Sequence, residues 1–226
     1  MKYVERLYRN DKGDEIIKPK YFPNYCCSGT NNEYYKKING LSKTIIKECL
    51  KKDIVEMNLY LDGGNFVCND RFVYITDKVL EQNSIYSKKE IDNIIKDLTG
   101  LIPITIEKNK CDVIGHTDAY LNFIDDSTAL IASYPSFPFL KDDIDFINHL
   151  DEELKSVGIK RITLFDRPID EIATCGCGNK NNKPCFYSAR GNYLNFIRIN
   201  NTIILPEYNL SSKKKLIIII KPIRKY

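Results

Sequence analysis

The chain has 226 residues, of which 43% are hydrophobic and 28% are charged. A chain of this length buries a sizeable core, and these fractions are ordinary for a globular protein, so we expect one domain over residues 1–226. The net charge is only +4 and is partly carried by basic residues near the C-terminus. The rest of the chain therefore lacks the basic surface that nucleic-acid binding requires, and we expect no nucleic-acid partner.

The sequence gives no sign of export or of a membrane span. The first six residues contain no apolar stretch of the kind found in secretory signals. The longest apolar run, residues 216–220, is broken by Lys221 and Pro222. Eight cysteines in such a chain are typical of reduced thiols. We therefore expect a cytoplasmic protein with no membrane partner.

The first part of the chain predicts a hairpin, a helix and a strand. Short β segments flank a turn at residues 10–13. Residues 41–52 have the spacing of an amphipathic helix, whose expected buried face is Leu41, Ile45, Ile46, Cys49 and Leu50. Residues 54–61 then predict a strand that leads into Asp62-Gly63-Gly64-Asn65.

From this point one pattern occurs three times. The dipeptide Asn-Phe is followed by a β-branched residue, by turn-forming residues and by a second apolar segment. It stands at Asn65-Phe66, Asn122-Phe123 and Asn195-Phe196. This pattern predicts one β-hairpin used three times, which is typical of an internally repeated fold.

Helices and further strands are expected between the hairpins. Ser87 and Glu90 form a capping box that opens a helix closed by Gly100, and residues 102–106 predict a strand. Residues 142–157 predict a second amphipathic helix with Ile144, Ile147, Leu150 and Leu154 facing inward, followed by a strand at 161–165. Each motif is thus hairpin, helix, strand. Such a motif cannot cover its own apolar face, so several must pack around a shared centre.

Gly115-His116-Thr117-Asp118 is the candidate site of chemistry. His116 is one of only two histidines, and Asp118 follows two residues later. On an extended backbone both side chains would point to the same face, which would place a carboxylate beside a titratable imidazole. The alternative is a histidine that serves only in a turn. This segment and residues 62–65 both stand just ahead of a hairpin, so we expect them in equivalent places near the shared centre.

The cysteines and the second histidine carry weaker signals. Cys175, Cys177 and Cys185 have a spacing that suggests a metal site but lack a fourth ligand nearby, and Cys26 and Cys27 are the available partners for zinc. We favour an exposed loop, and expect no metal and no cofactor. Two other thiols are expected to be buried core residues and one histidine to lie at a helix surface, namely Cys68, Cys111 and His149.

Taken together, several segments resemble the agmatine deiminase and bacterial peptidylarginine deiminase family, in the family's order. They lie within residues 21–206 and are Asp62-Gly63-Gly64-Asn65, residues 74–80, Gly115-His116-Thr117-Asp118, residues 192–196 and residues 204–206. The resemblance implies an α/β fold, a pseudo-fivefold propeller of ββαβ motifs that is incomplete here. It also implies hydrolysis of a guanidinium group to a ureido group and ammonia, through a Cys thiolate, a His and two Asp carboxylates.

By this resemblance, His116 would be the acid and base of the reaction, and Asp118 would bind the guanidinium. Asp62, Gly63, Gly64 and Asn65 would line the substrate pocket. The substrate would be a small molecule or peptide that carries a guanidino group, and the residues do not distinguish agmatine, arginine and peptidyl-arginine.

The chain also departs from the family pattern. It has no Trp for the family's Trp-x-Arg-Asp motif, and no Gly-rich segment ending in Cys after Pro206. Residues 207–226 form an atypical basic and isoleucine-rich tail. We therefore expect a chain truncated at both ends. Its alternative function is that of an inactive remnant or binding protein without the nucleophile, and self-association or a complementing fragment is a further possibility.

Overall fold

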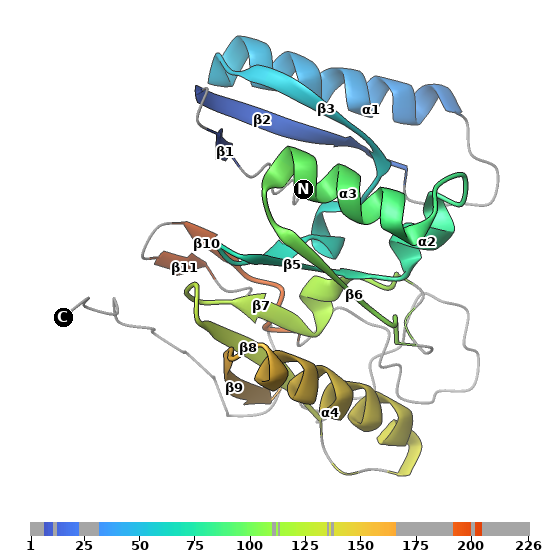
Figure 1. The fold of residues 1–226 in the computed structure, drawn as a ribbon, viewed down its shortest axis with the longest axis vertical. Helices are drawn as coiled ribbons and strands as arrows, with labels where there is room; N and C mark the ends of the chain where they lie inside the picture. The colour runs from blue at the N-terminus through green and yellow to red at the C-terminus, as the bar shows by residue number, and fades with distance from the viewer. Residues whose placement is uncertain are drawn as a thin grey trace, which may run out of the picture. The chain divides into compact units, whose positions relative to one another are not determined.

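The computed structural model describes residues 7–10, 13–22, 32–109, 112, 114–134, 136, 138–165, 192–199 and 202–204. Figure 1 shows the helices and strands along the chain, which divides into two compact units. The first comprises Met1–Lys108 with Ile114–Thr117, and the second comprises Asn109–Val113 with Asp118–Tyr226.

The first compact unit contains two three-stranded sheets. In the first sheet, β1 (Leu7–Asn10) pairs antiparallel with β2 (Gly13–Lys20), which pairs parallel with β3 (Asp53–Tyr60). The crossover from β2 to β3 contains α1 (Asn32–Thr44) and the π-helix η1 (Ile45–Leu50). The second sheet follows the short helix η2 (Gly63–Asn65). Its strand β4 (Val67–Cys68) pairs antiparallel with β5 (Phe72–Thr76), which pairs parallel with β6 (Ile102–Ile106). The crossover from β5 to β6 contains α2 (Lys78–Gln82) and α3 (Lys88–Thr99).

The second compact unit repeats the arrangement once more. After η3 (Thr117–Ala119), the hairpin of β7 (Leu121–Phe123) and β8 (Thr128–Ser133) is followed by η4 (Pro138–Leu140) and α4 (Lys141–Ser156). The strand β9 (Lys160–Phe165) then pairs parallel with β8. A further antiparallel hairpin consists of β10 (Ile197–Ile199) and β11 (Thr202–Ile204).

The ββαβ motif therefore occurs three times in the described residues, with a fourth hairpin after it. Its order has a physical reason: a tight turn joins antiparallel strands, whereas a parallel neighbour requires a crossover, which here is helical. The three hairpins expected at the Asn-Phe dipeptides are confirmed. The motif that ends in β3 was not recognised as a copy, because it carries no Asn-Phe dipeptide.

Helix α3 has the ends that its sequence predicts. The Ser87 side chain accepts from the Glu90 backbone N–H, and the Glu90 carboxylate accepts from the Ser87 backbone N–H, which completes the capping box. The hydrogen bond from the Ser87 backbone also holds the pKa of Glu90 below its ordinary value. Gly100 ends the helix with a φ of 69°, a conformation that favours glycine.

The expected helix at residues 41–52 is partly wrong. The helix begins at Asn32, and of its expected buried face only Ile46 is buried, whereas Leu41, Ile45, Cys49 and Leu50 are exposed. The physical reason is the change to a π-helix at Ile45. Its wider turn breaks the 3.6-residue period, so side chains on either side of this point no longer share one face.

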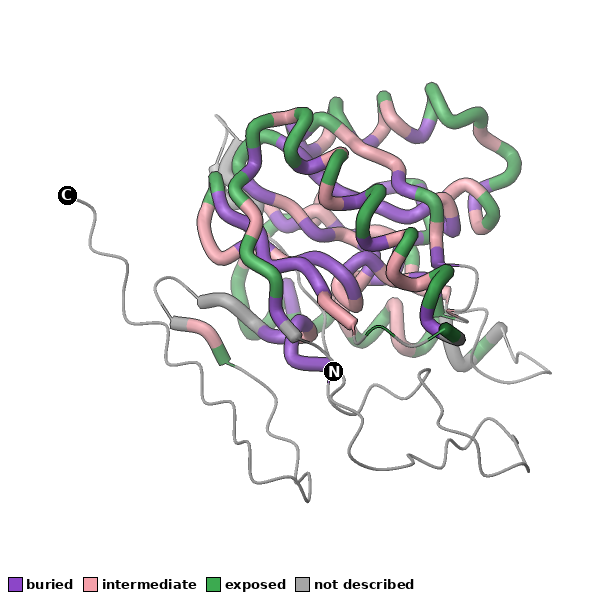
Figure 2. Tube along the Cα trace, turned by 90° about the horizontal axis from the view of Figure 1, so that it is seen from below, coloured by how far each residue is buried: buried purple, intermediate pink, exposed green. Residues whose placement is uncertain are grey.

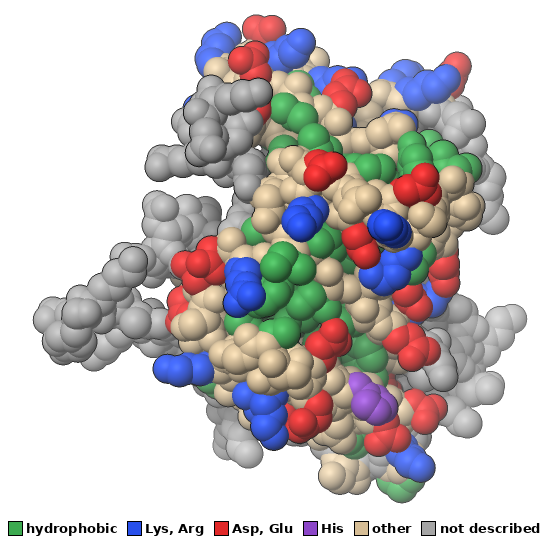
Figure 3. All heavy atoms as spheres, viewed as in Figure 1, with side chains coloured by type: hydrophobic (Ala, Val, Ile, Leu, Met, Phe, Trp, Pro, Cys, Tyr) green, Lys and Arg blue, Asp and Glu red, His purple; other side chains and the backbone are tan. Residues whose placement is uncertain are grey.

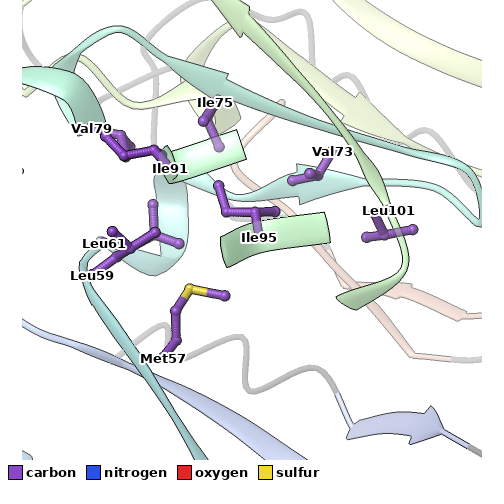
Figure 4. Close-up of a cluster of buried hydrophobic side chains, with 9 residues drawn as sticks. All are labelled: Met57, Leu59, Leu61, Val73, Ile75, Val79, Ile91, Ile95 and Leu101. Carbon is purple, nitrogen blue, oxygen red and sulfur yellow. The ribbon is translucent and has the colours of Figure 1, made fainter. Parts of the chain in front are cut away.

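The core of the first compact unit is built around α3 (Figure 4). Its residues Ile91 and Ile95 lie among buried side chains of β3, β5, α2 and the residues just after β3 and just before β6, which are Met57, Leu59, Leu61, Val73, Ile75, Val79 and Leu101. Helix α3 thus joins the two sheets of this unit through one apolar cluster. In Figure 2, buried residues lie mostly along the strands, whereas exposed residues recur at intervals along the helices.

The described surface carries charges of both signs. On the face shown in Figure 3, Lys and Arg side chains are interspersed with Asp and Glu. Among the helices within the described ranges, none is long and apolar enough to cross a membrane.

We predict that Ile95→Ala lowers the free energy of unfolding by about 2–5 kcal/mol, since it leaves a cavity between α3 and the two sheets. Ile85→Ala is the matched control, because this isoleucine is 84% exposed, and it should change stability by less than about 0.5 kcal/mol. Urea unfolding of the two variants measures the difference. Equal effects would contradict the central place of α3.

Candidate functional site

A tight turn after β3 places a buried carboxylate. Asp62 precedes η2, and its carbonyl oxygen accepts from the Asn65 N–H at 2.9 Å. The turn runs through Gly63 and Gly64, which are half-buried, and both Asp62 and Asn65 are buried. A carboxylate in such a place requires hydrogen-bonding or charged partners, because burial of an uncompensated charge is very costly.

His116 is one of these partners. Its Nε2 lies 3.0 Å from Asp62 Oδ2, and the two side chains are 16% and 3% exposed. An ionised carboxylate only accepts hydrogen bonds, so Nε2 donates and, in the neutral ring, Nδ1 is the basic nitrogen. The pair is therefore an imidazole held in one orientation by a buried carboxylate.

Asn65 and Thr76 hold the segment that carries His116. Asn65 Oδ1 accepts from the Thr76 backbone N–H and from Thr117 Oγ1, both at 2.8 Å. Thr76 Oγ1 in turn donates to the Gly115 carbonyl oxygen at 2.7 Å. The residues on both sides of His116 are thus fixed to the end of β5. This network gives Asn65 a structural role that the sequence did not indicate.

Lys78 is a site residue that the sequence analysis missed. Its side chain is 5% exposed, and its Nζ lies 3.7 Å from Asp62 Oδ2 and donates to the Ile114 carbonyl oxygen at 2.5 Å. The missed signal is a lysine at the start of α2, next to the buried strand β5 and the buried Val79. Lysine at a helix start is ordinarily exposed, so the sequence gave little reason to place it here.

Two buried polar atoms of the Asp62 turn have no hydrogen-bond partner among the described residues. They are Asp62 Oδ1 and Asn65 Nδ2. One is an acceptor and the other a donor, and both lie within four residues of sequence. Such atoms are commonly satisfied by water or by a bound polar group.

The expected extended backbone at His116 is wrong. Gly115 has a φ of +62°, and the chain then forms η3 at Thr117–Ala119. A left-handed residue followed by a 3-10 turn does not alternate its side chains as a strand does. Asp118 lies half-buried in this turn and belongs to the second compact unit. The buried carboxylate that meets His116 is therefore that of Asp62, 54 residues earlier in the chain.

The thiols of the described residues do not form such a site. Cys49 is exposed. Cys68 packs against the core cluster around α3 but is only partly buried, so the expected burial of this thiol is not complete. No three His, Cys, Asp or Glu side chains in the described part of the chain are arranged to hold a metal ion. The other cysteines considered above lie outside the described residues, namely Cys26, Cys27, Cys111, Cys175, Cys177 and Cys185. His149 is exposed on α4.

Comparison with known proteins gives a family and a fold. Residues 21–223 match the model of the Porphyromonas-type peptidyl-arginine deiminase family. Among solved structures, an agmatine deiminase of C. jejuni is similar at 23% identity and a TM-score of 0.65, covering 86% of this chain and 55% of that one. The agmatine deiminase of Enterococcus faecalis gives 16% identity and a TM-score of 0.66, covering 86% and 57%. No curated protein sequence matches.

These similarities confirm the expected fold class. The chain has the α/β propeller fold of the deiminases, built from repeated ββαβ motifs. It spans little more than half the length of either solved relative.

We predict that Gly115→Ala destabilises the protein by about 1–2 kcal/mol, because alanine at a φ of +62° is strained. An added Cβ would also touch the Lys78 side chain at 3.5 Å. Gly40→Ala is the control: this glycine lies inside α1 with nothing within 4 Å, so alanine should stabilise by about 0.5–1 kcal/mol. Urea unfolding measures the free energy of unfolding of both variants and distinguishes the expected loss from the expected gain. A stabilising effect of both changes would contradict the left-handed turn before His116.

Proposed function

Because the chain belongs to the Porphyromonas-type peptidyl-arginine deiminase family, we propose that it serves the hydrolysis of a guanidinium group to a ureido group and ammonia. The observation that carries this proposal is the buried pair of Asp62 Oδ2 and His116 Nε2 at 3.0 Å. A histidine oriented in this way exchanges protons with a reacting group through its other nitrogen.

His116 serves the two proton transfers of the reaction. In the first step a thiolate forms a bond to the guanidinium carbon, and the C–N bond breaks as His116 gives a proton to the departing ammonia. In the second step His116 takes a proton from water, whose oxygen bonds to the same carbon while the C–S bond breaks. The products are a ureido group and the restored thiolate.

Asp62 and Asp118 have different roles in this proposal. Asp62 Oδ2 already meets His116 and the Lys78 ammonium, so this oxygen serves the histidine and not a substrate cation. Asp118 then provides a carboxylate for bidentate binding of the guanidinium. Gly63, Gly64 and Asn65 form the turn beside His116, which supports the proposal that they line the pocket. Agmatine and peptidyl-arginine are both candidate substrates.

The thiolate is the part of the reaction that the described residues do not supply. Cys49 is exposed on η1, and Cys68 packs against the core cluster. This observation favours a second candidate function, in which the chain binds a guanidino ligand without hydrolysing it. A cysteine outside the described residues, or one on a complementing polypeptide, would restore the first function. A cytoplasmic location fits either function.

The test is release of ammonia and of a ureido product from agmatine, from arginine and from an arginyl peptide. If the chain is active, His116→Ala should lower kcat by about 10²–10⁴-fold, the usual contribution of general acid–base catalysis. His149→Ala is the control, because this histidine is exposed on α4 and should leave kcat unchanged.

Ligand binding separates the remaining outcomes. Heat released on agmatine binding, weakened by Asp118→Asn and without turnover, would support the binding function. Turnover that appears only with a second polypeptide would support a complementing fragment. Neither binding nor turnover, under any of these conditions, would contradict the proposal.

A further inference from the structure

We propose that Lys78 is a positioning residue that holds Asp62 and the His116 segment together, and thereby fixes the hydrogen bond between Asp62 and His116. Its meaning for catalysis rests on the proposed function of His116. The positioning itself is a property of the folded chain and is measured without any substrate.

Lys78 is a buried lysine with two polar partners. The Lys78 side chain is 5% exposed, whereas lysine is among the residues least often buried. A buried ammonium requires an opposite charge and hydrogen-bond acceptors, because desolvation would otherwise cost more than the fold gains. Lys78 has both, in Asp62 Oδ2 at 3.7 Å and the Ile114 carbonyl oxygen at 2.5 Å.

Both partners of the Lys78 ammonium are connected to His116. Asp62 Oδ2 is the same oxygen that meets His116 Nε2. Ile114 stands two residues before His116 in the chain. The ammonium therefore contacts both the carboxylate that orients the imidazole and the backbone that carries it. A lysine that only filled space in the core would not need its ammonium to contact both of these groups.

Lys78 also compensates the charge of the Asp62 carboxylate. The charged or titratable side chains at this point of the first compact unit include Asp62, His116, Lys78 and, beside Gly115, Lys108. Lys78 balances the negative charge of Asp62, so the carboxylate that meets His116 is not left as an uncompensated buried anion. Lys108 does not share this role, because its Nζ pairs with Glu81 at 2.5 Å and its side chain is 34% exposed.

Two contacts that hold the segment do not involve Lys78. Thr76 Oγ1 holds the Gly115 carbonyl, and Asn65 Oδ1 holds Thr117 Oγ1. Removal of the ammonium should therefore leave the segment attached, while the Asp62–His116 hydrogen bond loses its fixed geometry. This separates the positioning of His116 from the folding of the segment.

The experiment is NMR of the imidazole N–H protons in the full chain without ligand. In the unchanged protein, and in the control Lys108→Met, the His116 Nε2 proton should give a signal protected from exchange with water. In Lys78→Met that signal should be lost, while the backbone amide spectrum remains that of a folded protein. Lys78→Arg keeps the charge and should restore the signal at least in part. A retained signal in Lys78→Met would overturn the inference.

A double-mutant cycle keeps the inference testable if Lys78→Met does not fold. Removal of both charges, in Asp62→Asn with Lys78→Met, should give a higher urea midpoint than the two single changes predict by addition. Simple additivity would overturn the inference. A chain that lacks deiminase activity but loses the Nε2 proton signal in Lys78→Met would count against the proposed function alone.

Discussion

The burial of one carboxylate is the constraint on which the site depends. Asp62 lies on a tight turn after β3, where it is buried and its charge requires partners. Two residues distant in sequence, Lys78 and His116, meet its Oδ2. The need to pair this oxygen therefore brings together the turn after β3, the start of α2 and the segment before η3. The chemistry available at His116 follows from this arrangement.

The repeated ββαβ motif explains why these three segments can meet. In the second and third copies a short helix leads into the hairpin, η2 before β4 and η3 before β7. Strand β5 continues into α2 close to this point, so Thr76 and Lys78 face the segment that leads into the next hairpin. The repeat thus brings the turn before one hairpin next to the segment that leads into the following hairpin.

Local sequence signals located most of the described fold. The capping box at Ser87, the three Asn-Phe hairpins and the strand at residues 102–106 are all determined by neighbouring residues, and each is confirmed. The amphipathic helix at residues 41–52 was misjudged, because the π-helical turn at Ile45 changes the period on which such predictions depend. The first ββαβ motif was missed as a copy because it shares the topology and not the dipeptide.

The sequence alone identified the residues of the candidate site, which are a histidine within a Gly-His-Thr-Asp segment and an acidic residue before a Gly-Gly turn. It also indicated the family through the resemblance of these segments. The tertiary structure decided which carboxylate meets that histidine. Asp62 stands 54 residues before His116 in the chain, and the left-handed Gly115 followed by the 3-10 turn replaces the extended backbone that the sequence predicts around His116. It also decided that Lys78 is buried, because pairing of buried charges depends on contacts between segments and has no local pattern in the sequence.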